Sequence, residues 1–301
     1  MESISKIQGT DTDGPAQVGS WGRPAGKTIG FPNSATIAQI WNTPLVVEIG
    51  HSHGKQALQN GYSGLYAPAA NMHRSPFNGR NYEYYSEDSF LSGEMCGSAV
   101  QGIEEMGVYV YIKHFICNDG EAGIYRDAVY TWMTEQALRE IYLRPFQMLI
   151  EDYDATGLMS SYNRIGAVWA GGSEALLTGV LRDEWGFHGA VITDAVVSAW
   201  YMDGNLAIRT GGTKMLAFNI TNEFYRDLNS VGTVTAMRNA AHGTLYALAN
   251  SFAVTRAVSV PKWVKTTYAV DAVVAIILVA WEICAIRKYR KAKKEDEDTE
   301  Q

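Results

Sequence analysis

The sequence predicts an α/β fold, a (β/α)₈ TIM-like barrel, followed by a single C-terminal transmembrane helix. Short apolar runs typical of buried parallel strands alternate with longer amphipathic segments typical of helices, and this alternation requires crossover connections. Polar and charged residues gather directly after the apolar runs, as they do on the active face of such a barrel. Residues 263–286 are mostly apolar and are long enough to cross a bilayer.

The first half of the chain is expected to form two helices and two strands in alternation. In chain order, a helix, a strand, a helix and a strand are expected over residues 34–49, 63–66, 88–106 and 108–112. Pro32, followed by Asn33 and Ser34, signals the start of the first helix, and Ser86 or Asp88 is expected to cap the second. The last strand is rich in β-branched and aromatic residues, which suit a pleated, buried surface.

The second half continues the alternation. A long amphipathic helix, a strand, a helix, two strands and a last helix are expected over residues 128–150, 158–161, 176–185, 190–192, 215–218 and 233–251. The run 190–192 is short and wholly apolar, as expected of a strand that is buried on both faces. It leads to Asp194, so this carboxylate is expected at the C-terminal end of a parallel strand. A lone Asp in such a place is equally typical of a helix cap or a loop.

Composition narrows the classes of function. The 301 residues are 47% hydrophobic and 19% charged, so the chain can bury a sizeable core and most of it is not expected to be disordered. The net charge is −7 and the body has no basic stripe, so no nucleic-acid partner is expected. The 17 Tyr and 8 Trp residues fit either core packing or stacking against the apolar faces of sugar rings.

No cofactor and no metal site is expected. Cys96 and Cys117 lie among apolar residues and are expected to be buried thiols, and with Cys284 they show neither metal-ligand spacing nor a disulfide framework. His51 and His53 form an HxH pair, an arrangement that zinc uses. No third ligand follows nearby, and the flanking residues resemble the start of a helix, so the pair is expected to be structural.

Several longer motifs follow one another in a fixed order. They are Asp13-Gly14-Pro15, the run GRNYEYYSED over 79–88, Lys113-His114-Phe115, the run MSSYN over 159–163, and the run GFHGAVITD over 186–194. Together they resemble glycoside hydrolase family 3, in its β-glucosidase-like branch, over about residues 7–252. Several long motifs in one order are more specific than any one of them. The resemblance implies the N-terminal barrel domain of that family and the hydrolysis of O-glycosidic bonds.

The resemblance also implies roles for single residues. Asp194 would be the nucleophile of a retaining mechanism, in which two carboxyl groups lie about 5 Å apart. Asp13 would accept hydrogen bonds from the sugar hydroxyls farthest from the scissile bond. The expected donors to the ring hydroxyls are Arg80, Lys113 and His114. Tyr162 would lie close to the nucleophile.

Some of these residues have structural alternatives. Arg80 can simply pair with Glu83, which is itself expected to brace the site, and His114 can be a core histidine. Arg126 matches the second arginine of the family only with a stretched spacing. Ala195 follows the nucleophile where the family often has Trp or Tyr, which changes the wall of the sugar pocket.

The proton donor of the reaction is not found among these motifs. In the β-glucosidase-like branch it comes from a second, α/β sandwich domain, to which the resemblance does not extend. The related β-N-acetylglucosaminidases carry Pro-Gly-His-Gly after Lys-His-Phe, whereas residues 116–119 here are Ile-Cys-Asn-Asp. Few residues precede Asp13, where the family has a strand and a helix. The barrel is therefore expected to be incomplete at its N-terminus and the chain to be the later part of a larger enzyme, from a member with the barrel last and a membrane helix after it.

The tail differs in character from the body. A span of about 20 residues crosses a bilayer core at ~1.5 Å per residue, and the apolar residues of 263–286 show no one-sided stripe. Six basic residues follow between 287 and 294, so the positive-inside rule predicts a cytoplasmic tail and an extracellular barrel. Asp271 and Glu282 lie near the two ends of the span. The alternative is a buried amphipathic helix.

The expected organisation is a family 3 barrel domain, a linker, a transmembrane helix and a charged cytoplasmic tail over residues 1–252, 253–262, 263–286 and 287–301. The expected function is a single-pass, retaining β-glucosidase-like hydrolase of the cell membrane that acts on β-linked oligosaccharides or other β-glycosides. Its acid/base would come from a sandwich domain or a partner chain. The alternative is an inactive barrel that serves at most as a membrane-anchored sugar-binding module. A structural or adhesion module, the third hypothesis, would have no polar pocket around Asp194.

Overall fold

The computed structural model describes residues 10–19, 28–118, 120–121, 130–196, 201–217, 225–251 and 262–299. Two compact units separate between Arg256 and Ala257. The first unit contains the strands and most of the helices, and the second contains one long helix, α8 (Lys262–Thr299).

The main strands of the first unit are parallel to their neighbours. Their bounds are β1 (Asp11–Asp13), β2 (Gly64–Tyr66), β3 (Tyr109–Val110), β4 (Ile112–Phe115), β6 (Gly157–Ser160), β9 (Ala190–Val196) and β10 (Lys214–Ala217). One sheet has the order β1-β2-β3 and the other the order β10-β9-β6-β4. Only Tyr111 separates β3 from β4, and Ala69 forms a parallel bridge with Lys113, so the two sheets continue one another.

This ascending order is the one that a (β/α)₈ barrel requires, because each strand lies beside the strand that precedes it in the chain. The predicted α/β, barrel-like architecture agrees with it. Side chains also meet across the interior, where Lys214 Nζ of β10 donates a hydrogen bond to the Tyr111 hydroxyl at 2.5 Å. Pairing of β10 with β1, which would close the barrel, is not among the strand pairs of the described residues, and complete closure stays a prediction.

Helices follow the strands and pack against them, with α3 against β3 and α7 against β9. The helices of the first unit are α1 (Ser34–Ala38), α2 (Thr43–Gln59), α3 (Ser89–Glu105), α4 (Glu135–Ala137), α5 (Arg144–Glu151), α6 (Gly204–Arg209) and α7 (Val231–Ala249). Short 3₁₀ or π segments are η2 (Asn81–Glu83), η4 (Leu138–Tyr142), η5 (Ala170–Gly172) and η6 (Ala175–Glu184). Side-chain N-caps begin α1, α2, α3, α4, α6 and α7 at Asn33, Asn42, Asp88, Thr134, Asp203 and Ser230.

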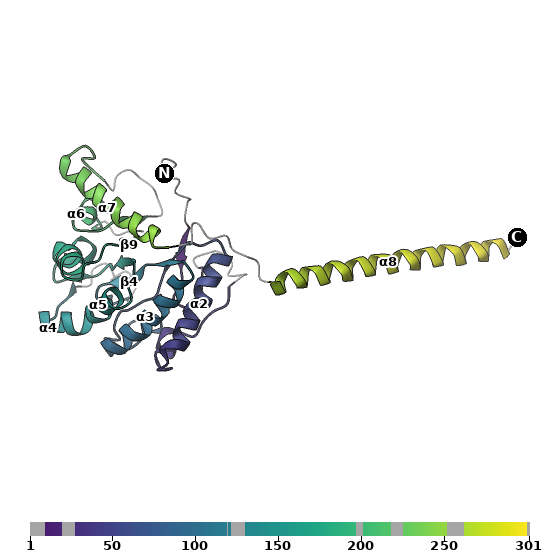
Figure 1. Ribbon diagram of the computed structural model, residues 1–301, viewed down its shortest axis with the longest axis horizontal. Coiled ribbons are helices and arrows are strands. Elements are labelled where there is room, and N and C mark those ends of the chain that lie inside the picture. Colours follow the sequence, from purple (N-terminus) through teal and green to yellow (C-terminus); the bar gives the residue numbers. More distant parts are fainter. Residues whose placement is uncertain are drawn as a thin grey trace. The chain divides into compact units, whose positions relative to one another are not determined.

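The helices α2 and α3 lie side by side (Figure 1) and touch through glycines. A Cβ on Gly102 would lie 2.2 Å from the Val47 carbonyl oxygen, and one on Gly50 would lie 2.6 Å from the Ala99 carbonyl oxygen. No side chain fits in that space, so the two backbones approach each other closely. This contact holds α2 against α3, which itself packs on β3.

The single helix expected over 34–49 is wrong, because two helices occupy this part of the chain. The first ends at Ala38, and α2 begins at Thr43 and extends to Gln59. The chain breaks at Trp41, whose φ of +51° is left-handed, and Asn42 then caps α2 by accepting the Leu45 N–H. An Asn followed by Thr-Pro is a start signal as strong as the one at residue 33.

The HxH pair therefore lies within α2 rather than at a helix start. His53 is buried and stacks on Phe31 with ring centroids 4.3 Å apart, and burial lowers the pKa of His53 to about 4. His51 lies at the surface, where its Nε2 is 2.6 Å from Glu105 Oε2. No group of three or more His, Cys, Asp or Glu side chains suited to a metal ion occurs in the part of the chain that the structure describes.

The helix expected over 128–150 begins later than predicted. Tyr130–Thr131 form a strand, β5, and the helical segment starts with α4 after the Thr134 cap; residues 128 and 129 lie outside the described residues. The strand β5 pairs with β7 (Arg164–Ile165), which pairs in turn with β8 (Val168–Trp169). These strands are two residues long, too short to show any periodicity, so sequence patterns do not reveal this small sheet.

Most of the remaining expected elements occur within one to three residues of their predicted bounds. The strand expected over 190–192 continues four residues farther, to Val196, and the strand expected over 108–112 is divided into β3 and β4. The segment over 176–185 is a π-helix, η6, and Phe218 lies outside the described residues. Cys96 and Cys117 are buried, as predicted, and burial raises the pKa of the Cys96 thiol. In the second unit, the helix from Lys262 to Ala292 is long and apolar enough to span a membrane by length and composition: it contains an 18-residue stretch with a mean hydropathy of 2.3, none of which is buried.

Candidate active site

A cavity of about 710 Å³ lies at the C-terminal side of the parallel strands. Five of the six residues that the sequence singled out line this cavity, namely Asp13, Arg80, Lys113, His114 and Asp194. Glu83 and Glu121 add two further carboxylates to its wall. The cavity is within the size range of small-molecule sites and is rich in polar groups that converge. The structural or adhesion hypothesis expected no such polar cavity around Asp194.

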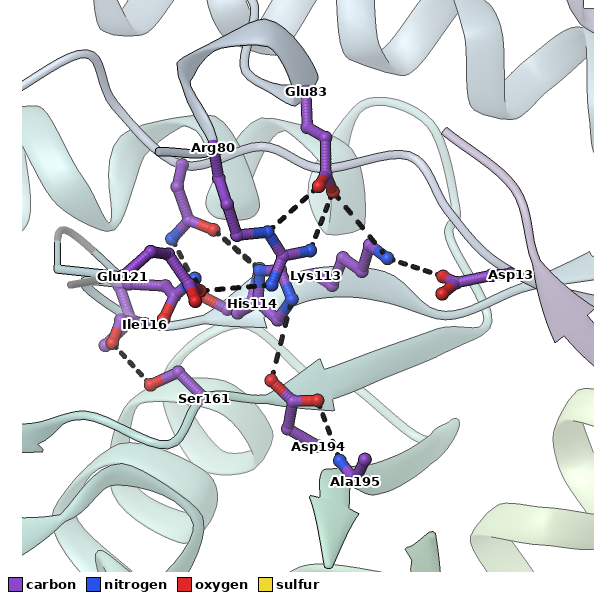
Figure 2. A network of polar contacts seen from close by, with 12 residues as sticks. Asp13, Arg80, Glu83, Lys113, His114, Ile116, Glu121, Ser161, Asp194 and Ala195 are labelled. Atoms are coloured by element: carbon purple, nitrogen blue, oxygen red, sulfur yellow. Dashed lines mark hydrogen bonds and ion pairs between the residues drawn. The ribbon is translucent and has the colours of Figure 1, made fainter. Parts of the chain in front are cut away.

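Arg80 is held in place by two carboxylates (Figure 2). Its Nε and Nη2 donate to the two oxygens of Glu83 at 2.9 and 2.7 Å, and its Nη1 donates to Glu121 Oε1 at 3.2 Å. The pair with Glu83 is bidentate, which fixes the plane of the guanidinium group. The pairing of Arg80 with Glu83 is therefore present, and Arg80 lies on the cavity wall at the same time.

Lys113 lies between Asp13 and Glu83 and contacts both carboxylates. Its side chain is 4% exposed, and its Nζ donates to Asp13 Oδ1 at 2.7 Å and lies 3.7 Å from Glu83 Oε2. Burial raises the pKa of Glu83, but the charges of Lys113 and Arg80 lower it by more, so the pKa of Glu83 lies below its ordinary value. Glu83 therefore stays ionised between the two cations.

His114 of β4 and Asp194 of β9 face each other, as Figure 2 shows, although β6 lies between their strands in the sheet. His114 is 1% exposed, and its backbone N–H donates to Asn71 Oδ1 at 2.7 Å. Its Nε2 lies 3.6 Å from Asp194 Oδ2, while Asp194 Oδ1 accepts the Ala195 N–H at 2.7 Å. One oxygen of the carboxylate is thus oriented by the backbone and the other faces the imidazole.

Two of the expected positions need a small correction. Asp194 is the fifth of seven residues in β9, and Lys113 and His114 lie within β4 rather than after its end. The ladder continues past the apolar residues because β9 pairs with β6 at Thr193 and with β10 at Ala195. Strand pairing, and not hydrophobicity, decides where these strands end.

Tyr162 is not among the residues that line the cavity. It is buried beside Trp169 and Met202 just after β6, and its carbonyl accepts the Tyr201 hydroxyl at 2.8 Å. Its expected place close to the nucleophile stays a prediction. Arg126, the family's second arginine with a stretched spacing, lies outside the described residues.

Sequence reasoning gave no role to two residues that shape the site. Glu121 is the second partner of Arg80 and also accepts from Asn118 Nδ2 at 2.7 Å. Asn71 binds both backbone polar groups of His114: its Oδ1 accepts the His114 N–H at 2.7 Å, and its Nδ2 donates to the His114 carbonyl at 2.8 Å. Glu121 lies only eight residues after Lys113 in the sequence. No such proximity marks Asn71, since its partner lies 43 residues away in the chain.

Comparisons with known proteins identify the family of this chain. The model of the glycosyl hydrolase family 3 N terminal domain matches residues 16–210. Beta-glucosidase A of Butyrivibrio fibrisolvens is 38% identical over 182 residues, which cover 60% of this chain and 22% of the relative. A beta-glucosidase of Rhizobium radiobacter is 39% identical over 185 residues, covering 61% of this chain and 22% of the relative.

Solved structures show the same likeness. Beta-glucosidase 3B from Thermotoga neapolitana in complex with glucose superposes with a TM-score of 0.75 at 30% identity, over 89% of this chain and 39% of that chain. Beta-glucosidase from Kluyveromyces marxianus in complex with glucose has a TM-score of 0.75 at 26% identity, over 83% and 30%. The chain belongs to glycoside hydrolase family 3 and corresponds to its N-terminal, barrel-like domain, in the β-glucosidase-like branch. It spans about a fifth of the length of the curated relatives named above.

Proposed function

We propose that this chain supplies the sugar-binding cavity and the nucleophile of a retaining β-glucosidase-like hydrolase that acts on β-D-glucosides or related β-glycosides. The observation that carries the proposal is the Asp194 carboxylate in a cavity with His114 and the Asp13–Lys113 pair. The glucosidase relatives, and the glucose present in the complexes of similar structures, support a hexose as the occupant.

In this proposal Asp194 attacks the anomeric carbon and forms a covalent glycosyl intermediate, which water then hydrolyses. The backbone N–H of Ala195 orients one carboxylate oxygen, so the group is positioned before the sugar arrives. His114 and Arg80 donate hydrogen bonds to ring hydroxyls, and Asp13 accepts them from the hydroxyls farthest from the scissile bond. Arg80 and His114 are held by Glu83 and Asn71, which limits the loss of side-chain entropy on binding.

The proton for the leaving group is proposed to come from an α/β sandwich domain, on this protein or on a partner chain. Three carboxylates of the cavity wall, those of Asp13, Glu83 and Glu121, are poor candidates for this role. Glu83 has a lowered pKa, whereas a general acid needs a raised one. Asp13 is bound by Lys113 and Glu121 by Arg80, so a cation lies beside each of them. With the acid supplied from elsewhere, the isolated chain is expected to turn over unactivated glycosides such as cellobiose slowly or not at all.

The proposal is tested by trapping the covalent intermediate. A 2-deoxy-2-fluoroglucosyl fluoride has a leaving group that needs little protonation, so the full chain alone should form a glycosyl ester on Asp194. Mass spectrometry of the intact chain and of its peptides reads the adduct. Asp194→Asn should show none, and the matched control Asp183→Asn, at an exposed position on η6, should be labelled like the unmodified chain.

The outcomes separate the candidate functions. An adduct on another carboxylate would show that the nucleophile is misassigned. A chain that binds glucose but forms no adduct would instead support the inactive, membrane-anchored sugar-binding module. Robust cleavage of cellobiose by the chain alone would reveal an internal acid.

We further propose that α8 anchors the protein as a single-pass helix in the cell membrane. Residues 263–286 would span ~36 Å at the helical rise, more than a bilayer core requires. The basic residues of the charged tail, 287–301, would hold that end in the cytoplasm and place the barrel outside. The barrel domain would occupy residues 1–252 and the linker 253–262; residues 252–261 lie outside the described residues.

The proposed orientation predicts a one-sided digestion pattern. Protease added to intact cells should digest the barrel and leave an epitope at the C-terminus intact. Permeabilised cells provide the control, because both parts are then accessible. Protection of the barrel in intact cells would contradict the topology and the extracellular substrate together.

A further inference from the structure

The parallel strands of the first unit enclose a second cluster of side chains. Leu65, Val110 and Leu158 belong to the large hydrophobic core, which includes helix residues such as Ile103 of α3 and therefore lies between strands and helices. Successive residues of a strand point to opposite faces. The inner face of the strands accordingly contributes Tyr66, Tyr109, Tyr111 and Met159 to the second cluster. Barrel interiors are usually filled by branched apolar residues, so three tyrosines are unusual there.

Two charged side chains reach these tyrosines from opposite ends of the strand order. On β1, the carboxylate of Asp11 accepts a hydrogen bond from the Tyr109 hydroxyl. On β10, Lys214 Nζ donates to the Tyr111 hydroxyl at 2.5 Å and lies 5.2 Å from the centroid of that ring. The rings of Tyr109 and Tyr111 meet edge to face, with centroids 5.6 Å apart. These four residues form a continuous set of contacts from β1 to β10, called here the interior network.

The two tyrosines at the centre of the interior network are held firmly. Tyr109 is 4% exposed and Tyr111 is 1% exposed. A side chain on Gly64 of β2 would collide with the Tyr109 ring, so the glycine gives that ring its place against the strand. The Tyr66 ring lies against Tyr111 with centroids 5.6 Å apart. Burial, and then the charge of Asp11, raises the pKa of Tyr111, so its hydroxyl stays protonated while it accepts from Lys214.

The interior network ends one step below two residues of the candidate site. Asp11 precedes Asp13 by two positions on β1, so the two side chains share a face, and both line the cavity. Lys214 is paired with β9 at Ile192, two positions before Asp194. No ladder joins β1 to β10 among the described residues. On that side of the sheet, the separation of the two strands is therefore set by the interior network and not by backbone hydrogen bonds.

We propose that Tyr111 and Lys214 are positioning residues that set the distance between Asp13 and the nucleophile Asp194. This inference rests on the proposed function of the cavity, in which Asp13 holds one end of the sugar and Asp194 attacks the other. Neither Tyr111 nor Lys214 is among the residues that line the cavity, so a bound sugar does not touch them. They act on the rate of attack, because a misplacement of about 1 Å can slow a reaction by about 100-fold.

The test measures how fast 2-deoxy-2-fluoroglucosyl fluoride labels Asp194 in the full chain in detergent. Labelling at increasing probe concentrations, followed by mass spectrometry, gives a maximal rate constant and a half-saturating concentration. Tyr111→Phe keeps the ring and removes only the hydroxyl. It should lower the maximal rate constant about tenfold and leave the half-saturating concentration nearly unchanged. Tyr153→Phe is the matched control, since it removes a hydroxyl that donates to the Glu94 carbonyl at 3.4 Å, outside the cavity.

Substitutions of Lys214 test the same contact from its other side. Lys214→Met should slow labelling as Tyr111→Phe does, and Lys214→Arg, which keeps a cation for the hydroxyl, should restore most of the rate. The double variant should be no slower than the slower single variant, because both changes break one contact. Losses that multiply would overturn the inference, because the two residues would then act independently.

The results distinguish this inference from the proposed function. An unmodified chain that forms no adduct on Asp194 overturns both. If the unmodified chain is labelled and Tyr111→Phe is labelled at the same maximal rate, the positioning role is overturned and the nucleophile assignment stands. Urea unfolding of the same variants identifies a purely structural role, in which stability falls while the maximal rate constant does not. A change confined to the half-saturating concentration also overturns the inference, because the residues would then act on binding.

Discussion

In the first unit Leu65, Ile112 and Leu158 are fully buried, whereas Ile276 and Leu278 of α8 are 68% and 56% exposed. Removing such a side chain from water is worth about 1.5–3 kcal/mol. The first unit gains this free energy from its own core, and α8 gains none of it within its own unit. The same residue types are therefore packed in the interior of the first unit and left exposed in the second, as the proposed membrane anchor requires.

The two units also differ in where their charged residues lie. The first unit buries Glu83 and Lys113, partly buries Arg80, and offsets the cost of desolvation by pairing them. The second unit keeps most of its charged residues at the two ends of its apolar stretch. If this comparison is right, deleting α8 should change where the protein resides, whereas altering buried pairs or contacts in the first unit should change how stable it is.

The largest effect is expected from removing the second unit. Deleting residues 263–301 should move the protein from the membrane pellet to the supernatant, because an apolar helix of this length inserts almost irreversibly. Ultracentrifugation after a carbonate wash measures the distribution. Glu282→Leu is the control, since it keeps the span apolar and should stay in the pellet. A truncated protein that remains in the pellet would contradict anchoring by α8.

A large loss of stability is expected from Glu83→Gln. It removes the charge between Arg80 and Lys113, which keep Glu121 and Asp13 as partners, so we expect a cost of about 3 kcal/mol in the free energy of unfolding. The folded pKa of Glu83 lies below the ordinary 4.5, so its stabilisation is complete above that pH and is lost as the pH falls through the folded pKa.

Urea unfolding of the full chain in detergent, at several values between about pH 3 and pH 7, checks this prediction. The difference between the unmodified chain and Glu83→Gln should shrink toward the acid end. A difference that does not depend on pH would show that the carboxylate acts through packing alone.

A smaller loss is expected at the contact between α2 and α3. In Gly102→Ala the new Cβ would lie 2.2 Å from the Val47 carbonyl oxygen, so the helices must separate, at a cost of about 2 kcal/mol. Gly232→Ala in α7 is the matched control, because nothing lies within 4 Å of its Cβ, and it should stabilise the chain by about 0.5 kcal/mol. Urea midpoints measure both variants, and equal shifts would argue against close helix packing.

The smallest effect is expected at the exposed pair of His51 and Glu105. The hydrogen bond to Glu105 raises the pKa of His51, although burial opposes it slightly. The pair therefore stabilises the fold below the ordinary pKa of 6.5 and ceases to do so as the pH rises through the folded pKa. After solvent screening it contributes at most about 0.5 kcal/mol.

Glu105→Gln should lower the pKa of His51, which an NMR titration of the imidazole would measure. Salt should reduce the difference between the two proteins, because both groups lie at the surface. An unchanged titration would mean that the contact does not persist in solution.

The sequence predicted the long elements of the first unit well, because their signals are local. Asp88 caps α3 as expected, and the apolar run 190–192 became part of β9. The left-handed φ of Trp41 has no sequence signature of its own, and the break there could be predicted only from the start signal of α2 that follows it at Asn42. The small sheet with β5 was missed because its strands are too short for a pattern.

The sequence was enough to select which residues line the candidate site, but not to predict which groups each of them contacts. The motifs selected Asp13, Lys113 and Asp194, and these line one cavity. Which group holds each of them depends on distant parts of the chain, as with Asn71, whose hydrogen bonds to His114 span 43 residues. A buried polar group must find a partner, but a sequence does not say which one.

The pairing of Asp13 with Lys113 cannot form until much of the chain has been synthesised, because the two residues are 100 positions apart. At a synthesis rate of about 5–20 residues per second, Asp13 leaves the ribosome ~5–20 s before its partner does. The Lys214–Tyr111 contact spans a further 103 positions. The cavity is consequently completed late, and the edges of the growing sheet stay open in the meantime. For this molecule, the side that carries the candidate site is thus among the last parts to be completed while the chain is being made.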